Sequence, residues 1–206
     1  MNAKFISIEG IEGAGKSTQL AFIQRYLSEH NKSLTVTREP GGTELGEKIR
    51  SLLLMPTDTA MAVDTELLLM FSARAEHVSQ VIKPALNRGQ WVLSDRFTDA
   101  TFAYQGGGRG IDQQRIEELA QWTLNGLKPD LTLLFDLPVE LGQQRVLSRN
   151  QGVDRFEQEK VDFFQKVREC YLVRAEEEPE RIKIIDASQS ILDIELQITN
   201  IIQPLL

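Results

Sequence analysis

The chain has 206 residues, of which 41% are hydrophobic and 26% charged, as is ordinary for a globular protein. This length can bury a substantial core, and we expect residues 1–206 to form a single domain. The 30 acidic residues outnumber the 23 basic ones and give a net charge of −7, which argues against a general nucleic-acid binder but permits a local basic pocket.

Short apolar runs alternate with helical patterns along the chain. The runs that predict strands are Phe5 to Glu9, Leu34 to Thr37, Trp91 to Asp95, Leu131 to Asp136 and Ile182 to Asp186. The helical patterns are about Lys16 to Glu29, Glu44 to Leu54, Thr65 to Asn87, Gln113 to Leu124, Val139 to Leu147, Glu157 to Glu176 and Leu192 to Ile202. This alternation predicts an α/β fold of three layers, with a five-stranded parallel sheet covered by helices on both faces.

A glycine-rich segment follows the first strand and leads into the first helix. It matches the pattern G-x-x-x-x-G-K-[ST], whose backbone N–H groups bind nucleotide phosphates at a helix N-terminus, so we expect a P-loop NTPase fold. Lys16 would reach the β- and γ-phosphates of ATP, and the Ser17 hydroxyl would ligate Mg²⁺. The predicted nucleotide-binding residues are Gly10, Ile11, Glu12, Gly13, Ala14, Gly15, Lys16, Ser17 and Thr18.

Arginines gather where the other strands end. Arg38 and Arg96 follow the second and third strands, and Arg145, Arg149 and Arg155 lie in or near a polar stretch. A hydroxyl acceptor would need a base to remove its proton, whereas a phosphate monoester is already a nucleophilic dianion. Such a dianion is repelled by the phosphates of ATP, and arginines can relieve this repulsion. Many arginines without an obvious base therefore favour a monophosphate acceptor. The sequence also lacks the Asn-Lys-x-Asp motif of a GTPase.

With these motifs in order along its whole length, the chain resembles the thymidylate kinase family. The motifs are the phosphate loop, Thr37 to Thr43, Phe71 to Arg74, Asp95 to Phe97, Ala103 to Gly110 and Asp154 to Glu157. The resemblance implies transfer of the γ-phosphate of ATP to dTMP, with Mg²⁺. Two alternatives stay open: a P-loop kinase for another small acceptor such as a deoxynucleoside, and a nucleotide-dependent binding protein without catalysis.

The resemblance also implies roles for individual residues. Arg38 and Arg96 would clamp the acceptor phosphate. Asp95 would act near the metal or the acceptor phosphate, and Glu9 would help through water. Arg149 and Arg155, in a lid at about residues 145–156, would supply charge to the γ-phosphate. The residues expected around the acceptor are Arg38, Pro40, Phe71, Arg74, Arg96, Thr101, Tyr104 and Gln105.

Within that set, Phe71 would stack on thymine, Arg74 would donate to thymine O4, and Tyr104 would exclude a ribose 2′-hydroxyl. Thr101 and Gln105 would meet the base edge, Thr101 because Ala100 stands where the family commonly has serine. An aromatic residue in an apolar helix is usually a core or dimer contact, but Arg74 one turn later favours stacking for Phe71.

Three further expectations concern the surroundings of the site. Arg50 either reaches the acceptor phosphate or pairs with Glu47 on the helix surface. The Glu39-Pro40 bond, at a sharp turn beside Arg38, is a candidate for a cis peptide. The resemblance implies a homodimer through the apolar side of the helix at about residues 65–81.

Cysteine and histidine are scarce in the sequence. A lone cysteine, Cys170, excludes an intramolecular disulfide and, with no cleavable signal sequence, predicts the reducing cytoplasm. The two histidines, His30 and His77, form no cluster with it, which excludes a structural zinc site. No apolar run approaches the ~20 residues of a membrane span, so we expect no association with membranes.

Overall fold

The computed structural model describes residues 3–56, 59–148 and 155–206. Five parallel strands form one sheet in the order β2-β3-β1-β4-β5. Their bounds are Phe5–Glu9 (β1), Leu34–Arg38 (β2), Trp91–Asp95 (β3), Leu131–Asp136 (β4) and Ile182–Asp186 (β5). The predicted sheet is confirmed, and only β2 extends beyond its predicted end, to include Arg38.

The helices also follow the predicted order. They are α1 (Lys16–Glu29), α2 (Glu44–Leu54), α3 (Val63–His77), α4 (Lys83–Asn87), α5 (Thr98–Thr101), α6 (Gln113–Leu124), α7 (Val139–Leu147), α8 (Val161–Glu177) and α9 (Ile191–Ile202). A π-helical turn, Val78–Ile82, joins α3 to α4, so that the helix predicted from Thr65 to Asn87 forms as one continuous rod. Helix α8 begins at Val161 rather than at Glu157.

A short helical segment after β3 was not predicted. Helix α5 continues into a π-helix over Phe102–Gly108, although the three glycines at its end favour a loop. Tertiary packing explains the difference, because a Cβ atom on Gly107 would lie 2.7 Å from the Cβ of Cys170 in α8. Glycine is used here for close approach between two helices.

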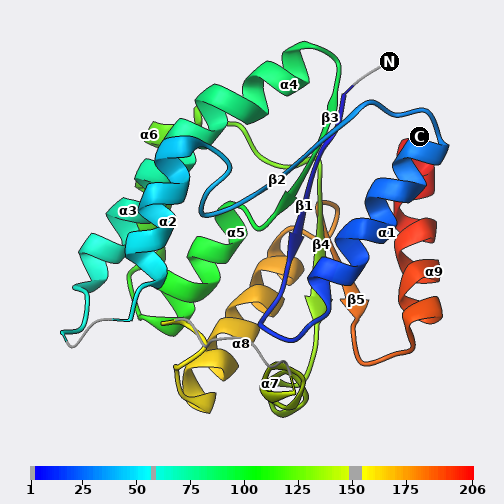
Figure 1. The fold of residues 1–206 in the computed structure, drawn as a ribbon. Helices are drawn as coiled ribbons and strands as arrows, with labels where there is room; N and C mark the ends of the chain where they lie inside the picture. The colour runs from blue at the N-terminus through cyan, green and yellow to red at the C-terminus, as the bar shows by residue number, and fades with distance from the viewer. Residues whose placement is uncertain (1–2, 57–58, 149–154) are drawn as a thin grey trace.

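Helices cover both faces of the sheet (Figure 1). Ile6 and Ile8 of β1 pack with α1 and α9 on one face. Phe5, which points the other way, joins Phe71 of α3 and Ile116 of α6 in a second cluster on the opposite face. Successive side chains of β1 thus serve the two helical layers in turn. Within the described part of the chain, no helix combines the length and apolarity needed to cross a membrane.

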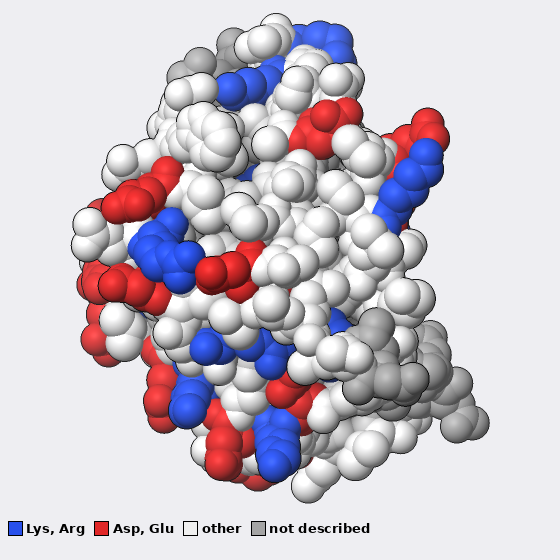
Figure 2. All heavy atoms as spheres, turned by 90° about the vertical axis from the view of Figure 1, so that its left-hand side faces the viewer, with Lys and Arg blue, Asp and Glu red and all other residues white. Residues whose placement is uncertain are grey.

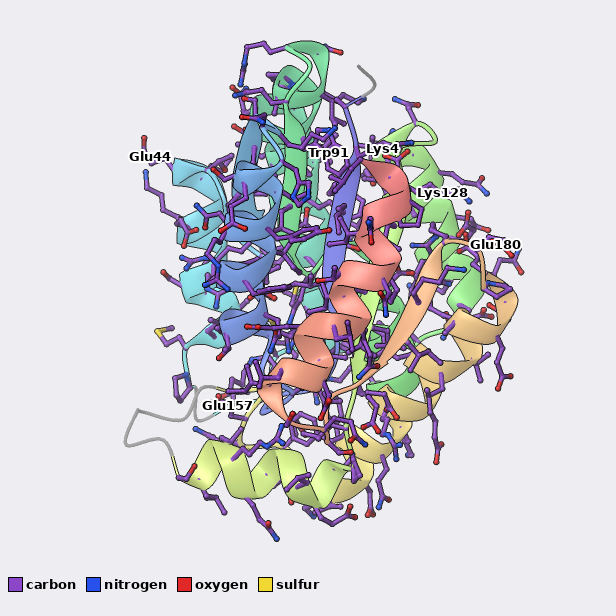
Figure 3. All side chains as sticks on the ribbon, turned by 90° about the vertical axis from the view of Figure 1, so that its right-hand side faces the viewer. Lys4, Glu44, Trp91, Lys128, Glu157 and Glu180 are labelled. Atoms are coloured by element: carbon purple, nitrogen blue, oxygen red, sulfur yellow. The ribbon has the colours of Figure 1, made fainter. Side chains whose placement is uncertain are left out.

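The carboxyl ends of the strands lie together at one edge of the sheet. Asp95 at the end of β3 pairs with Arg38 of β2 and with Ile8 of β1, so three strand ends are in register. Figure 3 shows Glu157 at this edge, at the opposite end of the molecule from Lys4 and Trp91. Ligands bind at the carboxyl ends of strands in such sheets.

Buried ion pairs fix the segment that follows Arg96. Asp99 in α5 lies 2.7 Å from Arg174 of α8 and 2.7 Å from Arg181, which precedes β5. The Asp99 side chain is only 3% exposed, and breaking such a pair would leave an uncompensated buried charge. The ion pairs therefore hold α5, and the residues that it carries, against α8 and the sheet.

Candidate active site

The loop between β1 and α1 wraps around the N-terminus of α1. Gly13 and Gly15 have left-handed backbones, with φ of 79° and 81°, which residues with a side chain rarely adopt. A Cβ atom on Gly13 would also collide with the backbone of Gly142 in α7. The glycines therefore let the loop turn tightly in front of α1, where backbone N–H groups and the helix dipole favour an anion.

Lys16, the first residue of α1, holds its ammonium group over this loop. Its Nζ donates hydrogen bonds to the carbonyl oxygens of Gly10 and Ile11, both at 2.8 Å. Burial, together with repulsion from Arg96, lowers the pKa of Lys16 to about 8, although Glu12 and Asp95 oppose the shift. The group is thus still mainly charged at pH 7, beside the loop that would bind a polyphosphate.

Arg96, directly after β3, has a strained backbone and a fixed side chain. Its φ of 68° lies in the left-handed region, which is costly for a residue with a Cβ and is often found at functional sites. The guanidinium donates to Glu12 of the loop at 2.7 Å and to the Tyr104 hydroxyl at 2.9 Å. The Tyr104 hydroxyl in turn donates to Glu12. The loop and the end of β3 are thereby joined through one arginine.

Glu9, the last residue of β1, holds the backbone next to Arg96. Its Oε1 accepts the backbone N–H of Phe97 and its Oε2 accepts the Tyr171 hydroxyl of α8, each at 2.7 Å. Burial raises the pKa of Glu9 to about 8, and the nearby Asp99 raises it too, against the effect of Arg96. Glu9 is fully buried and both its oxygens are bound by protein, so a metal role for it is not supported by this geometry.

A cavity of about 250 Å³ lies between the loop and the end of β3. Lys16 and Ser17 line it on the side of the loop, and Asp95 and Arg96 line it at the tip of β3. Other predicted residues that line it are Glu12, Gly13, Gly15, Pro40, Arg50, Arg74, Thr101, Tyr104 and Gln105. Residues from distant parts of the sequence thus meet around one cavity.

Several buried polar atoms on the cavity wall have no hydrogen-bond partner among the described residues. They are Nη1 of Arg74, Oδ1 of Asp95 and Oγ1 of Thr101. A buried polar group without a partner costs about 1–3 kcal/mol. These three atoms belong to residues of the cavity wall but expose almost no surface themselves, so a ligand would complete their hydrogen bonds only if the wall opens toward it. Nη1 and the Thr101 hydroxyl can donate, and the Asp95 oxygen can accept.

Of the residues predicted around the acceptor, Phe71 and Arg38 are not on the cavity wall. Phe71 is 2% exposed and packs in the core with Phe5, whereas its neighbour Met70 lines the cavity. One residue along a helix turns a side chain by about 100°, so the stacking predicted for Phe71 is not supported. Arg38 pairs instead with Glu47 at 2.8 Å, and its side chain is 54% exposed.

Arg50, for which two readings were open, lines the cavity and donates to the Pro40 carbonyl at 2.9 Å. A hydrogen bond from the Gly42 backbone lowers the pKa of Glu47, and the charge of Arg50 lowers it too, so the structure agrees with both predicted roles of Arg50. The Glu39-Pro40 bond is cis, as predicted.

The lid residues are only partly within the described structure. Arg149 lies outside the described residues. Arg155 forms an ion pair with Glu66 at 2.7 Å and donates to the Leu53 carbonyl at 2.7 Å. Arg155 thus holds the start of the post-lid segment against α2 and α3, and it does not line the cavity. Its predicted catalytic role is not supported by this arrangement.

Sequence reasoning missed several residues of the wall, among them Glu39, Met70, Phe97 and Phe156. Glu39 lies in the predicted turn beside Arg38, so its position near the site could be predicted from the sequence. Its buried contact with Arg74 could not. Phe97 follows Arg96 directly. Phe156 belongs to the motif Asp154 to Glu157, but no binding role was predicted for it, and Met70 is an apolar residue in an apolar helical stretch with no such motif.

Comparisons with known proteins agree on one family. The family model described as Thymidylate kinase matches residues 8–198. The chain is similar to a thymidylate kinase of Vesicomyosocius okutanii, with 57% identity over 98% of both chains, and to one of Pseudomonas putida, with 56% identity over 93% of this chain and 90% of the other. It is also similar to the crystal structure of thymidylate kinase from Ehrlichia chaffeensis, with a TM-score of 0.81, 31% identity, and coverage of 98% of this chain and 100% of the other.

Replacing Glu9 should change how stability depends on pH. The pKa of Glu9 is about 8 in the folded state and 4.5 in the unfolded state. At pH values between these two, folded Glu9 therefore holds a proton that unfolded Glu9 has lost. The free energy of unfolding therefore falls as the pH rises through this window, by at most about 1.4 kcal/mol per unit. Urea unfolding from pH 5 to 8 should show this fall in the wild type relative to Glu9→Gln.

The exposed Glu180→Gln serves as the control for loss of a carboxylate, since the Glu180 side chain is 99% exposed. Its curve should run parallel to the wild type. Parallel curves for Glu9→Gln and the wild type would contradict the assignment of a buried, proton-binding Glu9.

Proposed function

The chain belongs to the thymidylate kinase family, and we propose that its central cavity seats dTMP end to end with ATP on the phosphate loop. The protein is a phosphotransferase that converts ATP and dTMP to ADP and dTDP, a step of nucleotide biosynthesis. Residues 1–206 would act as one kinase domain, in the cytoplasm where both nucleotides occur. The observation that carries the proposal is that Lys16, Arg96 and Arg74 line one cavity. Family membership favours dTMP over a deoxynucleoside acceptor or a purely binding role.

On the donor side, residues Gly10 to Thr18 would hold the phosphates of ATP. Backbone N–H groups of the loop would bind the β-phosphate, and the Lys16 ammonium would leave the carbonyls of Gly10 and Ile11 for phosphate oxygens. Lys16 stabilises charge that develops on the transferred group, in a cavity where few waters weaken the interaction.

Mg²⁺ fits the residues at the mouth of the loop. Ser17 lines the cavity and Asp95 places an unpaired buried oxygen there. Mg²⁺ uses one or two protein carboxylates plus waters and phosphates, so the Asp95 carboxylate beside the loop fits it. We assign Ser17 and Asp95 as its protein ligands, direct or through water. When bound, the ion supplies positive charge to the phosphate oxygens.

On the acceptor side, Arg96 and Arg50 are two of the arginines that line the cavity. We propose that they bind the dTMP phosphate, Arg96 exchanging Glu12 for a phosphate oxygen. Arg38 can join them only by leaving Glu47. Tyr104, held against Glu12, would crowd the sugar 2′ position.

The base would lie against Arg74, Thr101 and Gln105. The unpaired Nη1 of Arg74 would donate to thymine O4, and the Thr101 hydroxyl would meet the base edge. Cytosine presents an amino donor at the same place, so it would leave Nη1 without an acceptor. Met70 and Phe97, rather than Phe71, supply the apolar wall.

Removing the Lys16 ammonium should abolish most turnover. We expect Lys16→Ala to lower kcat about 10²–10³-fold, the usual cost of deleting one electrostatic contact to a transition state. A coupled assay of ADP release with saturating ATP and dTMP measures it. Lys48→Ala, at an exposed helix position, controls for loss of a lysine. A Lys16→Ala enzyme with wild-type kcat would remove the loop from catalysis.

Removing the Arg74 guanidinium should weaken selection among bases. We expect Arg74→Ala to lower kcat/KM for dTMP and to narrow the preference for dTMP over dCMP by about 10-fold, because unpaired polar groups penalise the wrong base. Initial rates with each acceptor measure it. An unchanged preference in a folded variant would exclude base reading by Arg74.

We also propose a homodimer through α3 and α6. Much of this face carries uncharged side chains (Figure 2), including Leu68 at 54% and Trp122 at 78% exposure. A hollow there is lined by residues of both helices. They are Leu67, Leu68, Leu119 and Trp122, together with the charged residues Asp64, Arg115 and Glu118. Large exposed apolar groups in one area indicate an interface, and this one includes the predicted helix at about residues 65–81.

A charge placed on this face should dissociate the dimer. We expect Leu68→Lys to give a monomer in sedimentation velocity at micromolar concentration, since burying an unpaired ammonium is costly. Leu192→Lys makes the same change at a site 76% exposed on α9, on the other side of the sheet, and should leave the mass unchanged. Equal masses for both variants and the wild type would contradict this interface.

A further inference from the structure

Behind Arg74 lies a chain of buried polar side chains that leads away from the cavity. Arg74 Nε donates to Oε2 of Glu39 at 2.7 Å. Oε1 of Glu39 contacts Nδ1 of His77 at 2.9 Å, and Nε2 of His77 contacts the Thr37 hydroxyl at 2.6 Å. Arg74, Glu39 and His77 are 3%, 4% and 0% exposed. These hydrogen-bonded side chains therefore link β2, the turn after it and one face of α3.

The turn after β2 packs closely over the His77–Thr37 end of this row of side chains. Gly42 has a left-handed backbone, with φ of 80°. A Cβ atom there would lie 2.6 Å from His77 Cδ2 and 2.8 Å from Thr37 Oγ1. Only a glycine can therefore pass over the His77–Thr37 hydrogen bond at this distance. The backbone N–H of Gly42 is itself held by Glu47 at 3.0 Å.

Each link restricts the one before it. Glu39 fixes the guanidinium plane through Nε, while the Phe97 carbonyl accepts from Nη2 at 3.1 Å. Two of the three nitrogens are thus bound by protein, and Nη1 alone has no partner among the described residues. Glu39 is held in turn by His77, whose ring is oriented by Thr37 when Nδ1 donates and Nε2 accepts. The geometry leaves one buried donor of Arg74, a residue of the cavity wall, without a protein partner.

We propose that Glu39, His77 and Thr37 are positioning residues that set base selection by holding Arg74 with Nη1 directed at the base. This inference rests on the proposed contact between Arg74 and the base. A plain core role is the competing explanation, but an apolar cluster would stabilise a core at least as well as a buried charged chain. A donor whose direction is fixed discriminates better than one free to turn toward either base.

The experiment compares acceptors rather than overall activity. The variants are Glu39→Gln, His77→Gln and Thr37→Val, with Thr37→Ser as the conservative change that keeps the hydroxyl. Thr35→Val makes the same substitution two residues earlier on β2 and is the matched control. For each folded variant, kcat and KM are measured with dTMP, dUMP and dCMP. The acceptor dUMP keeps the O4 carbonyl that dCMP replaces with an amino group.

The expected result is a loss of discrimination at position 4 of the base alone. The preference for dTMP over dCMP should narrow about 10-fold in Glu39→Gln and about 2–3-fold in Thr37→Val, since the latter acts through two further hydrogen bonds. The preference for dTMP over dUMP and the KM for ATP should not change. Thr37→Ser and Thr35→Val should behave as wild type. A merely structural role would affect all three acceptors equally.

Two outcomes would overturn the proposal, and they are distinguishable. If Arg74→Ala narrows the preference but Glu39→Gln, His77→Gln and Thr37→Val do not, base reading stands and the positioning chain is wrong. If Arg74→Ala itself leaves the preference unchanged, both ideas fail. Should Glu39→Gln not fold, the partly exposed Thr37→Val decides the matter alone.

Discussion

The hydrogen bond from the Phe97 backbone N–H to Glu9, at 2.7 Å, joins the two strand ends on which the active site depends. Strand β1 continues into the phosphate loop and β3 ends at Arg96, so this bond and the β1–β3 pairing fix the separation of the two proposed phosphate sites. The bond also supports the left-handed Arg96, whose strain the surrounding structure must offset. Tyr171 binds the other oxygen of Glu9 and brings α8 into the same arrangement.

Charges around the cavity are balanced among themselves. Glu12 of the loop neutralises Arg96, Glu39 neutralises Arg74, and Lys16 lies near Glu12 and Asp95. Cations in a cavity of about 250 Å³ would otherwise repel one another strongly, because the interior screens charge weakly. Phosphate groups that replace Glu12 at Arg96 would keep this balance. The chain as a whole carries a net charge of −7, so attraction for two nucleotides must come from this local arrangement.

Much of this could be predicted from the sequence, for reasons that particular residues show. The strands were clear because residues such as Ile6, Ile8 and Leu133 are buried between two helical layers and form continuous apolar runs. The phosphate loop has a local pattern, since its function is carried by consecutive backbone groups. In contrast, the π-helix at Phe102–Gly108 depends on contact with α8. The local sequence does not predict this contact. The choice between Met70 and Phe71 depends on the rotation of α3, and the ion pairs of Arg38 and Arg155 depend on partners far along the chain.

The central claim is that two phosphate sites at neighbouring strand ends share one cavity. A crystal structure with adenosine and thymidine joined 5′ to 5′ through a polyphosphate tests it most directly. The account predicts that Lys16 and Arg96 both contact the phosphate chain and that Arg74 Nη1 lies within hydrogen-bond distance of thymine O4. It would be contradicted if Arg96 stayed on Glu12 and the thymidine end lay outside the cavity bounded by Arg74 and Thr101.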